Sequence, residues 1–368
     1  MLPVLFDNPP FNDRTELMTG AGTYVDLANV HMSQNDVWKV KLLELQNQLE
    51  HCLQRSATTS PRAATKLIGH TTTTFNTVET RNFELLSCLQ KWLRLDDKKN
   101  DAADDEILAL SQRKMAGSRE WLLGEEGRLT TWICSNHSND SKEQVLWLMS
   151  VAGAGKSVIA ASLLQLLKDK GSLGAYFFCK HNDEYRNSTV NVVKTMAYQL
   201  AKCYPEVAIA LDNLSKENEY LPLRASVDRL FEELIRRPAL LLSNRSKQVF
   251  VVIDALDECR KLGDERGILG MMAKWKSLPS CIRLFFTSRP NQDIAERLED
   301  KLKPIVLEIT ESQNLKDIQT YTIARMLKPD LLRIMAKPRD VVEHAAIRLA
   351  VRASGLFIWI ALRWAVLE

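Results

Sequence analysis

Three patterns follow one another in Trp147-Leu-Met-Ser-Val-Ala-Gly-Ala-Gly-Lys-Ser-Val-Ile-Ala-Ala-Ser-Leu-Leu164. An apolar strand runs from Val145 to Met149, small residues follow from Ser150 to Gly155, and a helix with an apolar face comes next. Small residues let several backbone N–H groups approach one anion, and the N-terminus of the helix directs its positive dipole end at the same place. This order is typical of a phosphate-binding loop, the Walker A element.

The Walker A pattern predicts a role for each of its residues. We expect Lys156 to reach the β- and γ-phosphates of a nucleotide and the Ser157 hydroxyl to ligate Mg²⁺. Ser150 stands where the pattern has glycine, and serine adopts positive φ less freely, so we expect some loss of affinity. A chance Gly-Lys-Ser at a helix start is the alternative, which the flanking strand and helix patterns disfavour. The residues expected to bind the phosphates are Ala152, Gly153, Ala154, Gly155, Lys156 and Ser157.

A second chemical element follows about a hundred residues later. Val251-Val-Ile-Asp254 is an apolar strand that ends in aspartate, the Walker B pattern. Carboxyl ends of parallel strands meet at one edge of an open sheet, so Asp254 is expected to support the Mg²⁺ ion held by Ser157. Asp257 and Glu258 follow, and we expect one of them to activate the attacking water. A solvated acidic turn is the alternative reading.

The next apolar strand ends in Phe285-Phe-Thr-Ser-Arg-Pro290. Arg289 at its end is our candidate for contacting the γ-phosphate and sensing its presence, the alternative being a surface arginine before a proline turn. After an earlier strand come His181, Asp183 and Arg186, which are more often ordinary polar residues of a loop.

The bulk composition excludes several classes of protein. The chain has 368 residues with 49 Lys and Arg against 46 Asp and Glu, a near balance that gives no support to a dedicated nucleic-acid binder. Its seven cysteines include no C-x-x-C pair and are typical of reduced thiols in the cytoplasm. The N-terminus lacks the pattern of a signal peptide, and no apolar run is long enough to span a membrane.

Changes of texture along the chain predict its organisation. Apolar strands alternate with helical segments, so we expect an α/β P-loop NTPase fold, a parallel sheet with helices on both faces. A small helical module precedes it and further helices follow it. The expected segments are a loop or disordered region over 1–33, a helical module with a charged linker over 34–112, the P-loop domain over 113–312, and over 313–368 the start of a truncated C-terminal helical domain.

The chain resembles a known family in the residues just described. It is similar to the NACHT domain of STAND NTPases, in the form found with WD or ankyrin repeats in fungi and other eukaryotes. The similar stretches are Ala152-Gly-Ala-Gly-Lys-Ser157, Val252-Ile-Asp-Ala-Leu-Asp-Glu-Cys259, Phe286-Thr-Ser-Arg-Pro290, Gly117-Ser-Arg-Glu-Trp-Leu122, Tyr176-Phe-Phe-Cys-Lys-His181, Met196-Ala-Tyr-Gln-Leu-Ala201 and Ser354-Gly-Leu-Phe-Ile-Trp359. They lie within residues 113–368, so the N-terminal third is outside the resemblance.

The resemblance implies a function. Members of the family bind ATP or GTP with Mg²⁺, often hydrolyse it slowly, and switch between a closed diphosphate form and an open triphosphate form that self-assembles with protein partners. By the same resemblance, the segment Gly153–Ser157 binds phosphate and Mg²⁺, Asp254 supports the metal, Asp257 and Glu258 activate water, and Arg289 is the sensor. The expected role is therefore that of a cytoplasmic signalling NTPase, with a C-terminal repeat sensor beyond this chain.

Two other functions stay open at this point. A P-loop ATPase acting on nucleic acid would call for a basic stripe or an added binding module, and the sequence shows neither. A catalytically silent scaffold would use the nucleotide only to stabilise its fold. The choice between ATP and GTP is also open, because backbone and apolar contacts often hold either base.

Overall fold

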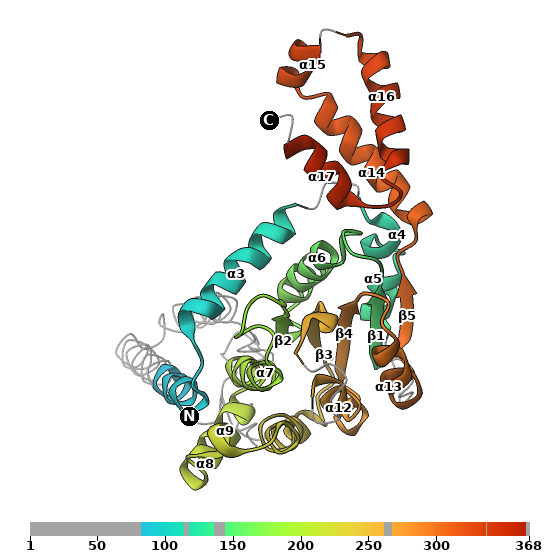
Figure 1. The fold of residues 1–368 in the computed structure, drawn as a ribbon. Helices are drawn as coiled ribbons and strands as arrows, with labels where there is room; N and C mark the ends of the chain where they lie inside the picture. The colour runs from blue at the N-terminus through green and yellow to red at the C-terminus, as the bar shows by residue number, and fades with distance from the viewer. Residues whose placement is uncertain (1–81, 114–117, 136–143, 261–266, 336, 366–368) are drawn as a thin grey trace, which may run out of the picture. The chain divides into compact units, whose positions relative to one another are not determined.

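A computed structural model of the chain describes residues 82–113, 118–135, 144–260, 267–335 and 337–365 (Figure 1). These residues fall into two compact units. The smaller contains the described residues 82–94 together with Ala197–Arg224, and the larger contains Leu95–Met196 and the chain from Ala225 onward. The expected loop over 1–33 and most of the expected helical module lie outside the described residues.

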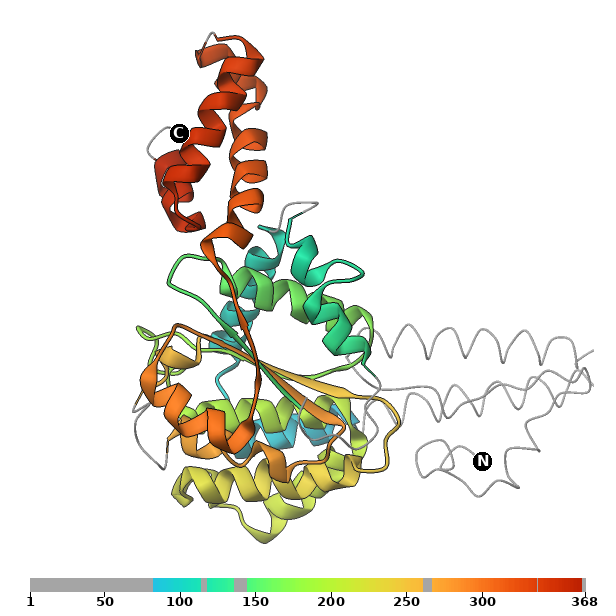
Figure 2. The same cartoon turned by 90° about the vertical axis from the view of Figure 1, so that its right-hand side faces the viewer.

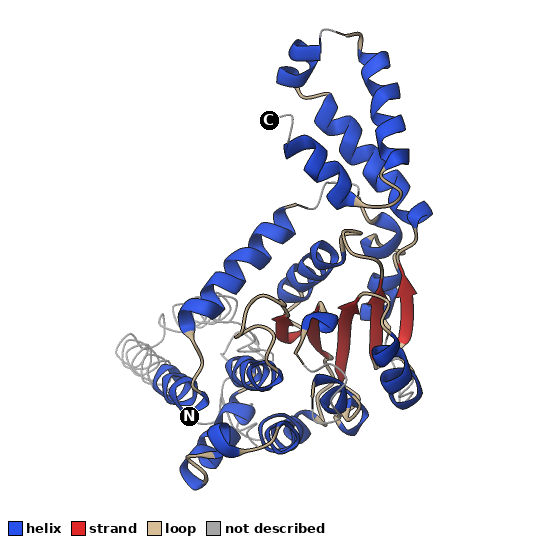
Figure 3. Ribbon diagram, in the orientation of Figure 1, coloured by secondary structure: helices blue, strands red, loops and turns tan. Residues whose placement is uncertain are grey.

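A five-stranded parallel sheet is the centre of the larger unit (Figure 3). Its order is β2-β3-β4-β1-β5, so β4 lies between the strand of the Walker A element and the strand of the Walker B element. Every residue of β3 and β4 is buried, as expected for strands covered on both faces. The strands are β1 (Val145–Met149), β2 (Leu173–Phe178), β3 (Val249–Asp254), β4 (Ile282–Ser288) and β5 (Ile305–Glu308).

Helices cover both faces of this sheet (Figure 2). On one face α3, α4, α5 and α6 share an apolar core with the strands, and on the other lie α12 and α13. The bounds are α3 (Asp97–Gln112), α4 (Glu120–Leu123), α5 (Arg128–Cys134), α6 (Lys156–Asp169), α7 (Thr189–Cys203), α10 (Val227–Leu230), η5 (Phe231–Arg236), α11 (Arg237–Ala239), η6 (Leu240–Leu242), η7 (Leu256–Glu258), α12 (Ile268–Met272), η8 (Trp275–Ser277) and α13 (Gln292–Leu302). The fold is therefore the α/β P-loop NTPase type predicted from the sequence.

The chain after β5 forms a group of helices that we call the C-terminal helices. They are α14 (Glu311–Met326), α15 (Pro329–Met335), α16 (Arg339–Arg352) and α17 (Phe357–Ala365). A capping box starts α14, in which Thr310 and Gln313 exchange side-chain and backbone hydrogen bonds. The helices bury an apolar cluster of their own that includes Ile318, Ala346 and Ile360, and alanine at such positions lets helices approach closely. No helix in the described part of the chain is long and apolar enough to cross a membrane.

The smaller unit is helical. A helix over 82–93 buries Leu89 and Leu93, and α8 (Pro205–Glu217) and α9 (Leu221–Arg224) belong to the same unit. The indole N–H of Trp92 donates to the carbonyl of Glu219 at 3.0 Å. Trp92 thus joins two segments of this unit that are far apart in sequence.

The charged segment expected to be a linker is a helix. Residues 97–112 form α3, which starts with Asp96 as its N-cap and buries Ile107 in the sheet core. Glu106 makes ion pairs with Lys180 and Arg186. The charged linker expected within residues 34–112 is therefore a packed helix over 97–112, in which most charged side chains are exposed and Ile107 is buried.

Candidate nucleotide-binding site

The Walker A loop connects β1 to α6 over residues 150–155. Gly153 has φ of 79° and Gly155 has φ of 96°, a region that residues with a Cβ rarely adopt. Gly155 is the N-cap of α6, and the first N–H groups of a helix have no partner within it. Ala152 is exposed on the loop and Ala154 is buried. The loop therefore has the backbone conformation that an anion-binding turn needs.

Ser150 occupies the position where the Walker A pattern has glycine. It is absent from the residues with positive φ, so the conformational reason for expecting weaker binding does not apply. Its hydroxyl donates to the carbonyl of Ile309 at 3.0 Å, and its N–H donates to the carbonyl of Ser288 at 3.3 Å. Serine here ties the start of the Walker A loop to the ends of β4 and β5.

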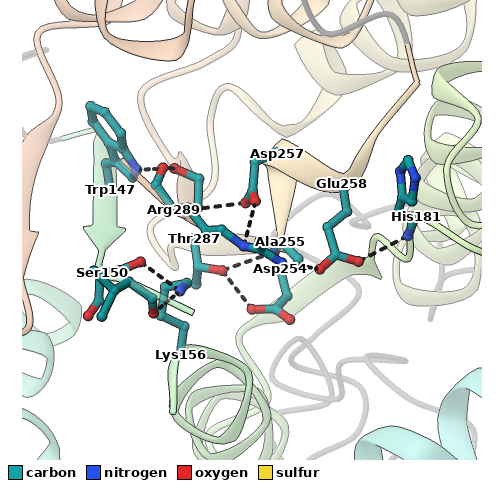
Figure 4. Close-up of polar contacts among 12 residues, drawn as sticks. Trp147, Ser150, Lys156, His181, Asp254, Ala255, Asp257, Glu258, Thr287 and Arg289 are labelled. Atoms are coloured by element: carbon teal, nitrogen blue, oxygen red, sulfur yellow. Dashed lines mark hydrogen bonds and ion pairs between the residues drawn. The ribbon is translucent and has the colours of Figure 1, made fainter. Parts of the chain in front are cut away.

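Lys156 folds back over the loop. Its ammonium donates to the carbonyls of Ser150 and Val151 at 2.8 and 2.9 Å (Figure 4). Burial lowers the pKa of Lys156, and the carboxylates of Asp257 and Asp254 oppose that shift. The one cation within the loop is thus held by carbonyl oxygens on one side and by the field of the acidic residues on the other.

Asp254 lies at the centre of a buried cluster at the end of β3. Thr287 on β4 donates its hydroxyl to Asp254 Oδ1 at 2.6 Å and accepts the N–H of Ala255 at 2.9 Å (Figure 4). Burial raises the pKa of Asp254, while hydrogen bonds from Ser157 and Thr287 act to lower it. Ser157 and Asp254, which come from two distant motifs, are therefore hydrogen-bonded to each other; their role as Mg²⁺ ligands stays a prediction. Sequence reasoning missed Thr287, although it precedes Arg289 by only two residues.

The two carboxylates after Asp254 face Arg289. Ala255 has φ of 53°, which turns the chain into the short helix η7. Arg289 donates its backbone N–H to Asp257 Oδ1 at 3.0 Å, and its guanidinium lies 3.3 Å from Asp257 and 3.5 Å from Glu258. Glu258 also accepts the N–H of His181 at 3.0 Å. We call Asp257, Glu258 and Arg289 the acidic turn.

The polar residues after β2 have structural partners. Asp183 accepts the N–H groups of Tyr185 and Arg186 at 2.9 and 3.2 Å, an Asx-type turn. Arg186 is buried and bonds the carbonyl of Phe178 at 2.8 Å and the carboxylate of Glu106 at 2.5 Å. Of the three residues only His181 reaches the candidate site, and it does so through its backbone.

A second polar network contacts the Walker A loop at Ala154, and the sequence predicted no role for its residues. Arg119 precedes α4 with φ of 65° and donates to the carbonyl of Ala154 at 3.0 Å and to the side chain of Asn314. Its N–H bonds Asp317 at 3.1 Å, and its guanidinium lies 3.7 Å from the same carboxylate. Burial lowers the pKa of Arg119 to about 10, which the charge of Asp317 opposes. We call Arg119, Asn314 and Asp317 the Arg119 junction.

The same side of the loop is covered by α17. The N–H of Ile358 donates to the carbonyl of Gly153 at 3.3 Å, and the ring of Phe357 lies 4.6 Å from the Arg119 guanidinium. A Cβ added at Gly153 would lie 2.2 Å from a methyl of Ile358, and one at Gly155 would lie 2.5 Å from Arg119. The two Walker A glycines are therefore required by φ and also by the close approach of these neighbours.

Together these features define the class of the fold. A glycine turn leads from β1 into a helix that begins with Lys156 and Ser157. The side chain of Ser157 hydrogen-bonds Asp254, which ends β3, two strands away from β1 in a parallel sheet. This is the arrangement of a P-loop NTPase fold.

Part of the chain is similar in sequence to one known family. The sequence model for the N-terminal region of nephrocystin 3 matches residues 117–289, a little under half of the chain. This range includes the Walker A loop, the Walker B strand and Arg289. No curated protein matches the sequence.

Weak structural likenesses were also found among solved structures. Cdc6p from Pyrobaculum aerophilum is 16% identical over 57% of this chain and 51% of its own, about half its length, with a TM-score of 0.35. A Walker-type ATPase of Pyrococcus abyssi is 13% identical over 70% of this chain and 76% of its own, with a TM-score of 0.36. PCH-2 of C. elegans is 14% identical over 71% and 60%, with a TM-score of 0.31. Likenesses of this size do not bear on function.

Proposed function

We propose that the chain is a nucleotide-controlled signalling NTPase of the NACHT type, which binds ATP or GTP with Mg²⁺ and hydrolyses it slowly. One observation carries the proposal. Ser157 of the Walker A helix and Asp254 of the Walker B strand, which are remote in sequence, share a hydrogen bond beside Lys156. A structural role alone does not call for a lysine, a serine and a buried carboxylate at one glycine turn.

The residues present suit a nucleotide and a magnesium ion. A hydroxyl and a carboxylate are hard oxygen ligands of the kind that Mg²⁺ prefers. The raised pKa of Asp254 comes from burial, and a bound dication would relieve the cost of keeping that carboxylate charged. Lys156 would hold phosphate oxygens, for which it would exchange the carbonyls of Ser150 and Val151. The ion would supply charge neutralisation at the phosphates.

The acidic turn would provide the remaining groups. Glu258 and Asp257 are the candidates for orienting and deprotonating water, and in this structure both are paired with Arg289. The pairs are partly exposed, so they cost little to exchange. Arg289 would have to leave these carboxylates to contact a γ-phosphate. The carboxylate that acts as the base would become available only after Arg289 leaves it, and this requirement is compatible with slow hydrolysis.

The Walker A loop also offers a route from nucleotide to protein shape. Its carbonyls at Gly153 and Ala154 hold Ile358, Arg119 and Asn314. Any change of the loop on nucleotide binding would therefore alter the docking of the C-terminal helices. We propose that this coupling drives self-assembly and the recruitment of protein partners, because a ligand shifts a conformational equilibrium through its differential affinity for the two states.

Nucleotide affinity measured by calorimetry, with and without Mg²⁺, tests the proposal. We expect Lys156→Ala to abolish binding and Glu258→Gln to preserve binding while slowing turnover. Arg297→Ala, at a partly buried basic residue of α13 outside the site, is the matched control for the lysine. Unchanged affinity in Lys156→Ala would refute the assignment of the loop. The base of the nucleotide that co-purifies with the protein decides between ATP and GTP.

Turnover measured on the same proteins, with and without DNA or RNA, separates the alternatives. A silent scaffold would bind nucleotide with equal and negligible turnover in wild type and Glu258→Gln. A nucleic-acid ATPase would be stimulated by DNA or RNA and would bind it with a steep dependence on salt.

A further inference from the structure

Two buried cysteines lie beside the acidic turn. Cys179 directly follows β2 and Cys259 directly follows Glu258, yet their sulfur atoms are only 3.2 Å apart. Each residue is about 5% exposed. The proposed function assigns no role to either thiol.

The backbone holds the pair in place from both sides. The N–H of Cys179 donates to the carbonyl of Asp254 at 3.0 Å, and the N–H of Arg260 donates to the carbonyl of Asn187 at 2.9 Å. The hydrogen bond to Cys259, together with burial, holds the pKa of the Cys179 thiol well above its ordinary value. The Cys179 thiol is therefore neutral in the reduced protein, which is compatible with its position at a buried strand end.

A metal site does not account for the pair. Thiolate sites for zinc or iron–sulfur clusters use three or four ligands. In the part of the chain that the structure describes, no group of three or more His, Cys, Asp or Glu side chains is placed to hold a metal ion. Two thiols in contact have a different chemistry open to them, which is oxidation to a disulfide.

We propose that Cys179 and Cys259 form a redox-modification site, in which a hydroperoxide converts the dithiol to a disulfide that restrains the acidic turn. A disulfide has its sulfurs about 2.05 Å apart, so the two atoms need to close by about 1 Å. Side-chain rotation with a small backbone shift covers that distance. Both strand ends are already anchored, so the bond needs no rearrangement of the sheet.

The chemistry balances in two steps. One cysteine loses its proton and attacks the hydroperoxide as the thiolate; the O–O bond breaks, giving a sulfenic acid, and the leaving oxygen takes up a proton and departs as an alcohol, or as water from hydrogen peroxide. The second thiol then attacks the sulfenic sulfur, so that the S–S bond forms and the S–O bond breaks with loss of water. The pair loses two electrons and two protons in all.

The location gives the bond a consequence. Glu258 immediately precedes Cys259, and Cys179 is covalently continuous with the end of β2. A disulfide would therefore fix the acidic turn against β2 and restrict the movement that Glu258 needs in order to leave Arg289. This effect on turnover rests on the proposed function, whereas formation of the bond does not.

Hydrogen peroxide treatment of the full chain tests the inference. We expect peptide mass mapping to find residues 179 and 259 cross-linked with the loss of two hydrogens. Turnover should fall by about tenfold or more, as small misplacements of reacting groups do, while the affinity for Mg-ATP stays within about twofold. Dithiothreitol should restore turnover. Cys179→Ser and Cys259→Ser should keep their turnover under peroxide, and Cys281→Ser, outside the pair, should respond like wild type.

Each other outcome overturns a stated part. No 179–259 cross-link refutes the site, and so does equal inactivation of Cys179→Ser and wild type. A cross-link with unchanged turnover refutes the restraint of the acidic turn. A chain that binds no nucleotide refutes the proposed function, and the mass mapping still decides whether the redox site exists.

Discussion

Arg119 and Arg289 each bind a carboxylate near the Walker A loop, and the burial of the two pairs differs. The Arg119 side chain is 5% exposed and its partner Asp317 is 7% exposed, whereas the Arg289 side chain is 53% exposed. Breaking a buried ion pair leaves an uncompensated charge in the protein interior, which is unfavourable, so the pair stays formed. The partners of Arg289 are 11% exposed at Asp257 and 28% exposed at Glu258, so these pairs are only partly buried and exchange partners at a lower cost than the Arg119 pair. We therefore expect the ion pair of the Arg119 junction to stay formed and the ion pairs of the acidic turn to exchange partners.

The largest effect is expected at the Arg119 junction. Asp317→Ala removes the carboxylate and leaves the buried guanidinium uncompensated, which should cost about 3–5 kcal/mol in the free energy of unfolding. Asp317→Asn keeps an oxygen for the N–H of Arg119 and should cost less. Urea unfolding measures both, with the exposed Asp300→Ala as control. A loss below about 1 kcal/mol for Asp317→Ala would contradict a fixed junction.

The second-largest effect on stability is expected at Thr287, in the buried cluster around Asp254. Thr287→Val keeps the shape of the side chain but removes its hydrogen bonds with Asp254 and Ala255, at a cost of about 1–3 kcal/mol. Losing the donor also removes an influence that lowers the pKa of Asp254. Thr287→Ser retains the hydroxyl and should stay near wild type in the same urea titration. Equal losses in both variants would show that packing, not hydrogen bonding, makes Thr287 important.

In the absence of metal, Asp254→Asn should raise the stability of the folded state, whereas the preceding substitutions lower it. Burial raises the pKa of Asp254 in the folded state, so the folded state binds this proton more tightly than the unfolded state. Its contribution to stability therefore falls as pH rises from the ordinary aspartate pKa through the raised value. At pH 7 without Mg²⁺, Asp254→Asn should melt above wild type.

The difference in melting temperature between Asp254→Asn and wild type should shrink as the pH is lowered through the raised pKa of Asp254, because the wild-type carboxyl then becomes protonated. With Mg-ATP present the order should reverse, because only the carboxylate binds the ion. Scanning calorimetry over pH provides the measurement. An Asn variant that melts below wild type at pH 7 without metal would contradict this account.

The smallest effect on stability is expected at Arg289. Arg289→Ala should change the free energy of unfolding by less than about 1 kcal/mol, yet alter the response to nucleotide. Sedimentation in diphosphate and in a non-hydrolysable triphosphate should distinguish the two nucleotides for wild type and not for the variant. Should the variant assemble on triphosphate as wild type does, the sensor is another residue. A stability loss comparable to that of Asp317→Ala would erase the contrast between the two regions.

The sequence by itself predicted the glycine turn before α6 and the aspartate that ends β3. In both, the chemistry depends on backbone conformation and side chains within a few residues of one another, so the glycines, Lys156, Ser157 and Asp254 form a local pattern. The alternation of apolar strands and helices likewise predicted a parallel sheet. The roles expected for Asp257, Glu258 and Arg289 stay predictions, although the structure brings the three together.

Only the tertiary structure decided which distant residues meet. β4 lies between β3 and β1 in the sheet, and this order places Thr287 against Asp254 and Arg289 against Asp257 and Glu258. Arg119 and Asp317 are 198 positions apart, and Cys179 and Cys259 are 80 apart, separations over which no local pattern operates. The charged helix α3 packs against the rest of the unit because Ile107 is buried in an apolar core formed with the sheet and with α4, α5 and α6. Burial, and with it the contrast between a fixed and an exchangeable ion pair, is a property of the assembled layers and not of any one segment.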